Sequence, residues 1–240
     1  MNIITLYRWL PLSILILVLI LFFYFHLYNY VSFASLKAHH ELLLHWNQQH
    51  YSLSVLIFIS LYIVSIACSI PAVTILSLVG GMLFGTILGT LYIVMSATLG
   101  ASLFILIVRT AIHNWMTVKN IKWLQQMQTG FQKNAFSYLL VLRLLPIFPF
   151  WMVNIVAAIL NVRLKIFALA TFIGIIPISF IHALIGTSLG NLLANDTPPT
   201  LATFLTPPIL LPLLALALLV IAPVIYKLWQ TRQKGNINSS

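Results

Sequence analysis

The sequence predicts an all-α integral membrane protein, with about five transmembrane helices plus two facing re-entrant hairpins in an inverted repeat. Three observations support this prediction. Of the 240 residues, 61% are hydrophobic and 6% are charged, whereas about a quarter of the residues of a soluble domain carry charge. Five apolar stretches approach the roughly 20 residues that a helix needs to cross a bilayer core. Two more are interrupted by proline, glycine or arginine, and broken backbone at membrane depth occurs only where protein or a watery cavity surrounds it.

The first expected span is retained in the mature chain. It lies near residues 10–29, which is too long for the apolar part of a signal peptide, and no small-residue cleavage site follows it. The other expected spans lie near residues 52–68, 88–108, 165–187 and 207–227. The span at 52–68 is short because Pro71, which opens the next apolar stretch, follows closely.

The first interrupted stretch covers residues 69–87 and contains a glycine pair, Gly80 and Gly81. Glycine permits positive φ and close backbone approach, so this pair is expected at the tip of a hairpin. Gly85 and Gly89 continue from Gly81 at intervals of four residues. The same spacing also suits plain close packing between two membrane helices, so both interpretations stay open.

The second interrupted stretch covers residues 135–161 and holds Arg143, Pro146, Pro149 and Asn154. Arginine is costly in hydrocarbon and marks a candidate functional site. Its guanidinium matches a phosphate as a two-pronged donor, so Arg143 is a candidate ligand of a lipid phosphate. Two alternatives stay open: that it binds carbonyl groups freed by the prolines or a nearby hydroxyl, or that its side chain reaches the head groups.

Basic residues concentrate in the linker between the two halves. Arg109, Lys119, Lys122 and Lys133 accompany apolar residues at roughly helical spacing, and no acidic residue interrupts them. This pattern is typical of a helix that lies in the head-group layer. The positive charge also marks the linker as cytoplasmic.

The remaining composition excludes several classes of protein. The formal net charge is +10, but the basic residues flank apolar spans, so anionic lipid head groups are the expected partner and nucleic acid is not. The single cysteine, Cys68, allows no intrachain disulfide or thiol metal site. In "HHELLLH" the histidines His40 and His45 are five residues apart, whereas a zinc-protease helix needs four. No catalytic set can be assembled, so no enzyme, metal or cofactor is expected.

The interrupted stretches together resemble a known family, the DedA superfamily in its SNARE-associated, VTT-domain branch. The likeness covers about residues 69–190. The matching positions are Phe84 and Gly85 with Gly89, Gly100 with Ala101, the run Arg143-x-x-Pro146-x-x-Pro149 with Asn154, and then Thr171, Gly174, Pro177 and Gly186. Their order and spacing, more than any one of them, carry the resemblance.

The resemblance implies two re-entrant hairpins that face each other, and a role in moving lipids between leaflets. In relatives this role includes phospholipid scrambling, phosphatidylethanolamine flipping and the return of polyprenyl-phosphate carriers. Arg143 would be the family's hairpin arginine, and the hairpins would be shaped by Gly81, Gly85, Pro146, Pro149 and Asn154. The chain departs from the family in three ways: the first hairpin has no acid, no second arginine closely follows Arg143, and Ala158 replaces a glycine. Proton coupling is therefore not expected.

Three regions are expected: N-terminal helices with an interfacial segment at 1–68, the VTT-like core at 69–190, and a loop, last span and basic tail at 191–240. The predicted function is movement of phospholipid or polyprenyl phosphate between leaflets. The alternatives are a transporter of a small solute or ion, and a membrane scaffold that uses the basic linker. Since the chain is compact and shows no organelle signal, the expected location is the bacterial inner membrane. A homo-oligomer remains open.

Overall fold

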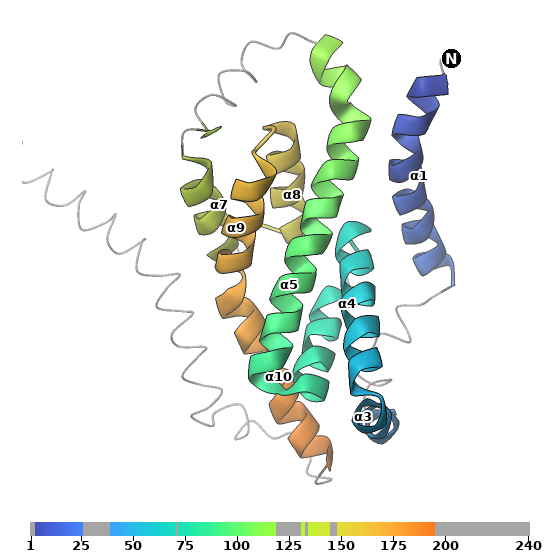
Figure 1. Ribbon diagram of the computed structural model, residues 1–240, viewed down its shortest axis with the longest axis vertical. Helices are drawn as coiled ribbons and strands as arrows, with labels where there is room; N and C mark the ends of the chain where they lie inside the picture. The colour runs from blue at the N-terminus through green and yellow to red at the C-terminus, as the bar shows by residue number, and fades with distance from the viewer. Residues whose placement is uncertain are drawn as a thin grey trace, which may run out of the picture. The chain divides into compact units, whose positions relative to one another are not determined.

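The computed structural model describes residues 3–25, 39–70, 72–118, 131–132, 134–144 and 148–194, all within one unit of the chain, residues 1–198. These residues are helical and include no strand, which confirms the all-α prediction for the described part. The helices are α1 (Ile3–Tyr24), α3 (His40–Gln49), α4 (Tyr51–Ala67), α5 (Val73–Val118), α7 (Ala135–Leu144), α8 (Phe150–Ile159), α9 (Leu164–Gly174) and α10 (Ile176–Ala194) (Figure 1).

Helix α5 is a hairpin rather than one straight rod. At Gly85 the backbone leaves the helical region, with φ 76° and ψ 177°. A Cβ added to Gly89 would lie 2.7 Å from the carbonyl oxygen of Gly80, although nine residues of straight helix would separate the two by about 13 Å. The chain therefore turns back on itself, and Figure 1 shows the first limb, residues 73–84, beside α4 and the second limb, residues 86–118, running past both.

The structure places this reversal at Gly85 and not at the glycine pair expected to form the tip. Gly80 and Gly81 lie inside the first limb, where they permit close packing. A Cβ on Gly80 would lie 2.7 Å from the ring of Phe58, and a Cβ on Gly81 would lie 2.0 Å from the carbonyl oxygen of Ala183 in α10. Gly89 serves the same purpose between the two limbs.

Replacing Gly85 tests the reversal by itself. An added Cβ would meet no atom within 4 Å, so any cost comes from the backbone conformation, which is essentially restricted to glycine. We expect Gly85→Ala to lower the free energy of unfolding by about 1–3 kcal/mol, measured by thermal unfolding in detergent. Ile87→Ala, at a side chain that is 79% exposed, is the control and should change little. Equal melting temperatures for the two variants would contradict the assigned conformation.

The expected count of five spans is not reproduced among the described residues. Two stretches are long and apolar enough to cross a membrane: Val73–Ala111, which includes the break at Gly85, and Ile176–Leu193. Glu41–Gln49 and Tyr51–Ala67 qualify together, but they are bent by 117°. The shorter apolar helices are Ser13–Tyr24, Ala135–Leu144, Phe150–Ile159 and Leu164–Gly174. The span expected at 207–227 lies outside the described residues.

Two expected spans have different boundaries in the structure. The stretch near 165–187 consists of two helices, α9 and α10, which meet at Ile175. The stretch near 10–29 begins earlier, because α1 runs from Ile3 to Tyr24. The helix expected at 52–68 is present as α4.

The core follows one side of the second limb of α5. Ile93, Ala97, Ala101 and Ile105 are buried and recur every four residues, which is one face of a helix. Buried residues of α4, α8 and α9 belong to the same apolar cluster. The second limb is therefore the central support on which both halves of the described chain pack.

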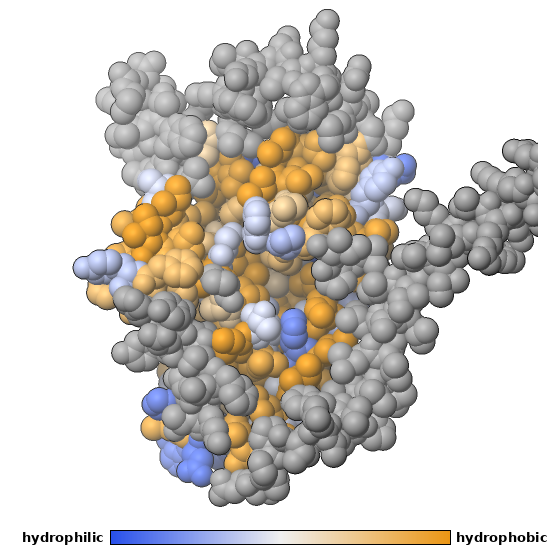
Figure 2. All heavy atoms as spheres, turned by 180° about the vertical axis from the view of Figure 1, so that it is seen from behind, coloured by the Kyte–Doolittle hydropathy of each residue, from blue (hydrophilic) through white to orange (hydrophobic). Residues whose placement is uncertain are grey.

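The outer surface is also apolar. Ile87, Leu56 and Leu169 are 79%, 61% and 57% exposed, and Figure 2 shows hydrophobic side chains over most of the visible described face. A soluble protein rarely exposes so much contiguous apolar surface. Lipid is the environment in which such a surface is stable.

Candidate functional site

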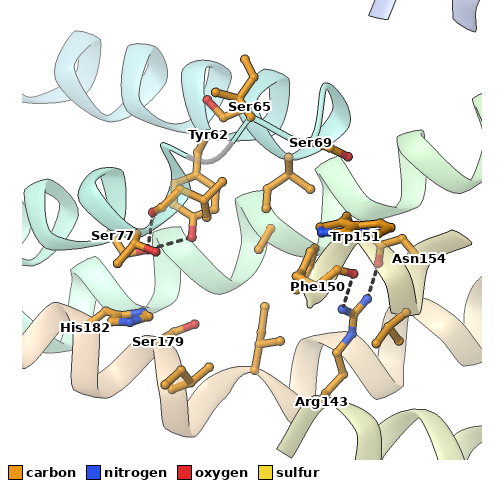
Figure 3. Close-up of a pocket in the computed structure, with 18 of the residues that line it drawn as sticks. Tyr62, Ser65, Ser69, Ser77, Arg143, Phe150, Trp151, Asn154, Ser179 and His182 are labelled. Atoms are coloured by element: carbon orange, nitrogen blue, oxygen red, sulfur yellow. Dashed lines mark hydrogen bonds between the residues drawn. The ribbon is translucent and has the colours of Figure 1, made fainter. Parts of the chain in front are cut away.

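A cavity of about 630 Å³ lies where the chain reverses direction twice, between α4 and α5 and between α7 and α8 (Figure 3). Its lining is mainly apolar, and none of the described lining residues is acidic. The polar lining residues are Tyr62, Ser65, Ser69, Thr74, Ser77, Arg143, Trp151, Asn154, Ser179 and His182. These polar groups come from both halves of the chain.

The first reversal is a tight turn between antiparallel helices. The Ser69 amide donates to the carbonyl of Ile66, and Ser69 has a φ of 54°. Tyr62 on α4 and Ser77 on α5 are joined by a hydrogen bond of 2.9 Å. Because the Ser77 hydroxyl donates to the Val73 carbonyl at 2.8 Å, the proton in the first bond comes from Tyr62.

Arg143 lies in the last turn of α7 and is 6% exposed. Its Nε donates to Thr171 Oγ1 in α9 at 3.3 Å, its Nη1 to the Phe150 carbonyl at 3.4 Å, and its Nη2 to Asn154 Oδ1 in α8. The Phe150 ring lies 4.0 Å from the guanidinium carbon, within the range of cation–π attraction. Gly174 makes room for the arginine, since a Cβ there would lie 2.5 Å from Arg143 Cβ.

These contacts leave Arg143 with spare donor capacity. A guanidinium has five N–H groups, and three have acceptors within the described residues. All three acceptors are uncharged, so the positive charge has no countercharge among them. The backbone carbonyl that Arg143 binds belongs to Phe150, which follows Pro149. A proline frees the carbonyl one helical turn before it, so this carbonyl is not one freed by Pro146 or Pro149. Pro149 itself begins α8 as its N-cap.

Of the polar cavity residues, only Arg143 and Asn154 were singled out from the sequence; Tyr62, Ser179 and His182 are among those that were not. Tyr62 lies in α4, and Ser179 and His182 lie in α10, which reads as an ordinary apolar span. The available signal was the spacing of Ser179 and His182, three residues apart and so on one face of a helix. Nothing in the sequence indicates which face of α10 meets the cavity.

The other predicted site residues lie elsewhere or outside the described chain. Arg109 lies away from the cavity lining: its Nη2 donates to the Ala157 carbonyl at 3.4 Å and to the Val162 carbonyl, so it fastens the end of α8 to α5. The predicted residues outside the described ranges are Pro71, Pro146, Lys119, Lys122 and Lys133. The described residues contain no group of three or more histidine, cysteine or acidic side chains that could hold a metal.

Apolar helices, an apolar outer surface and a cavity between helix reversals define an integral membrane protein. Residues 70–188 match the VTT domain, which coincides with the region that carries the resemblance. The chain belongs to the VTT-domain family, the DedA/SNARE-associated group of membrane proteins.

The chain is similar to the vertebrate Transmembrane protein 41B. It is 32% identical to the Mus musculus protein over 182 residues, which cover 74% of this chain and 60% of that relative. Identity to the Homo sapiens protein is 31%, covering 71% of this chain and 57% of the relative; for Danio rerio the values are 30%, 61% and 53%. The chain thus spans less than two thirds of the length of these relatives. No solved structure matches it significantly.

Proposed function

We propose that this protein moves phospholipid, or a polyprenyl phosphate, between the two leaflets of its membrane. One observation carries the proposal: at one end of a largely apolar cavity lies a buried arginine with two N–H groups that the described residues leave unpaired. A phosphate diester fits both features, because its charge complements the guanidinium and its acyl chains remain in the bilayer.

The two reversals beside the cavity are, in this proposal, the deep turns of two re-entrant hairpins. The first hairpin consists of α4 and the first limb of α5, and the second of α7 and α8. Each is followed by a longer apolar segment, the second limb of α5 in one half and α9 with α10 in the other. This repeated order favours an inverted repeat, which in transporters brings the substrate site to the bilayer midplane. The first hairpin then starts earlier than the stretch 69–87.

The lipid crosses because the cavity reduces the cost of bringing a head group inward. A charged phosphate is strongly disfavoured in hydrocarbon. Arg143 offsets this cost by supplying both opposite charge and paired N–H donors. Since the proposed first hairpin contains no acidic residue, movement down a lipid gradient is favoured over proton-driven transport.

A liposome assay tests the role of Arg143. Purified full-length protein is placed in vesicles that contain a fluorescent phospholipid, and the inner-leaflet label that becomes accessible to an impermeant reductant is followed with time. Arg143→Met should lower the rate at least about tenfold, since a hydrogen bond to a charged group contributes about 1.5–3 kcal/mol. Arg143→Lys should be intermediate, because lysine keeps the charge and loses the fork.

Arg109→Met is the matched control, because it removes an arginine that does not line the cavity. It should keep transport within about threefold of the wild type, provided both proteins elute as single species in detergent. If Arg143→Met moves lipid as fast as Arg109→Met, Arg143 does not bind the phosphate.

The alternatives make different predictions in the same vesicles. A solute or ion transporter would show flux of a small solute with no change in lipid distribution. A scaffold would show neither activity, and its cellular phenotype would survive Arg143→Met and be lost on replacing Lys119 and Lys122. No catalytic role is proposed. The bacterial inner membrane stays a prediction, because the relatives named above are from vertebrates.

A further inference from the structure

Several hydroxyl groups in the helices are satisfied within their own helix. Each of several serines and threonines donates to the carbonyl four residues earlier, which is a common arrangement in apolar helices. The donors are Ser77, Thr90, Ser96, Thr98, Ser102 and Thr110. A hydroxyl that does not bond in this way needs another partner.

Ser179 is one of the hydroxyl residues without such a bond, and like Ser65 it lines the cavity. It is 3% exposed, and within the described residues its hydroxyl has no hydrogen-bond partner, not even the Ile175 carbonyl that precedes it by one turn. Packing does not seal off its oxygen, whereas it does seal off the unbonded Ser54 Oγ and Arg109 Nε. The hydroxyl is therefore open to the cavity.

His182 lies one turn beyond Ser179 and lines the same cavity. Its imidazole also has no hydrogen-bond partner among the described residues. Figure 3 shows both side chains on α10, along the pocket from Arg143. A neutral imidazole offers one donor and one acceptor, and a serine hydroxyl offers both. The pair therefore presents uncharged hydrogen-bonding groups to the cavity. Leaving such groups unpaired in an apolar cavity costs free energy.

We propose that Ser179 and His182 form a second site in the cavity, which binds the hydrogen-bonding part of a lipid head group: a hydroxyl, as in glycerol, or a primary amine, as in ethanolamine. This inference rests on the proposed lipid transport and specifies its substrate class. Choline can neither donate nor accept a hydrogen bond through its quaternary nitrogen. The described cavity lining also offers choline no carboxylate, and the Phe150 ring already contacts Arg143 at 4.0 Å.

The consequence is selectivity among phospholipids that share one phosphate chemistry. Arg143 meets the same phosphate diester in the ethanolamine- and choline-type lipids, both zwitterionic, whereas the site at Ser179 and His182 favours head groups that can pair with it. We expect the wild-type protein to move glycerol- and ethanolamine-type lipids about tenfold faster than the choline-type lipid, the difference that one or two uncharged hydrogen bonds supply.

The test measures the ratio of rates for labelled lipids that differ only in the head group, in vesicles of one composition. For Ser179→Ala combined with His182→Leu, the ratio of ethanolamine to choline rates, which compares two zwitterionic head groups, should fall from about ten to near one. His182→Gln, which keeps a donor and an acceptor, should retain most of the ratio. Ser102→Ala is the matched control for serine removal, because Ser102 Oγ bonds Thr98 and lies outside the cavity lining; it should leave the ratio at the wild-type value.

Each outcome decides the inference. A wild-type ratio near one, or an unchanged ratio in the double variant, overturns it while leaving lipid transport intact. Faster movement of choline lipid also overturns it, in favour of binding by aromatic rings. If the wild type moves no lipid, the proposed function fails and this site fails with it. If the double variant does not fold, Ser179→Ala alone decides, since it removes a single atom and should lower the ratio about threefold.

Discussion

Gly186→Ala should destabilise the protein by about 3 kcal/mol or more, the upper range for overpacking. A Cβ at Gly186 would lie 2.0 Å from the carbonyl oxygen of Leu78 in the first limb of α5. Backbone cannot yield as a flexible side chain can, so α10 and the first limb must separate. Separation also weakens the bond of 2.8 Å that Thr187 Oγ1 donates to the Gly81 carbonyl.

Gly190→Ala is the control for this prediction. Its added Cβ would lie 2.9 Å from Met82 Cγ, and methionine is flexible enough to move away. We expect a loss of less than about 1 kcal/mol. The two variants are compared by their melting temperatures in the same detergent, and similar values would show that α10 does not lie as close to α5 as the structure has it.

Asn154→Leu should lower the free energy of unfolding by about 1.5–3 kcal/mol, the contribution of a hydrogen bond to a charged group. Asn154 is 1% exposed and its Oδ1 accepts from Arg143 Nη2. Leucine has a similar size but no acceptor, so it leaves a buried positive charge with one partner fewer. Thr171→Val removes the longer bond to Nε, 3.3 Å, and should cost about 1 kcal/mol.

A double-mutant cycle separates this interaction from simple loss of packing. Arg143→Met added to Asn154→Leu removes the charge as well as its acceptor, so the pair should cost at least about 1 kcal/mol less than the sum of the single changes. Unfolding in detergent measures all four proteins. Additive losses would show that Arg143 and Asn154 do not interact.

The sequence alone predicted the class of fold and the two apolar stretches that are interrupted. Apolar composition indicated membrane helices, and proline and glycine indicated broken segments. The position of the reversal inside α5 was less accessible, because the sequence does not distinguish Gly80 or Gly81 from Gly85 as the residue at which the chain turns. One kind of glycine permits helix contact and the other permits positive φ, and only the fold tells them apart.

The candidate site was predicted at Arg143 and Asn154 and missed in α10. Arg143 stood out because a charge in an apolar stretch is rare, and Asn154 lay close to it in the chain. Ser179 and His182 are mild exceptions in a helix that already contains threonine and glycine. Their importance depends on how α10 is rotated about its axis, which is set by the contact of Gly186 with Leu78.

That contact also sets the order in which the protein can be completed. Thr86 and Gly81 bond to Thr187 across 101 and 106 residues of chain, so the first limb of α5 is synthesised well before α10 exists. Until α10 is made, the face of that limb that contains Gly81 lacks the helix that packs against it in the folded protein. The first limb of α5 therefore completes its packing only when α10 is present, although it is synthesised much earlier.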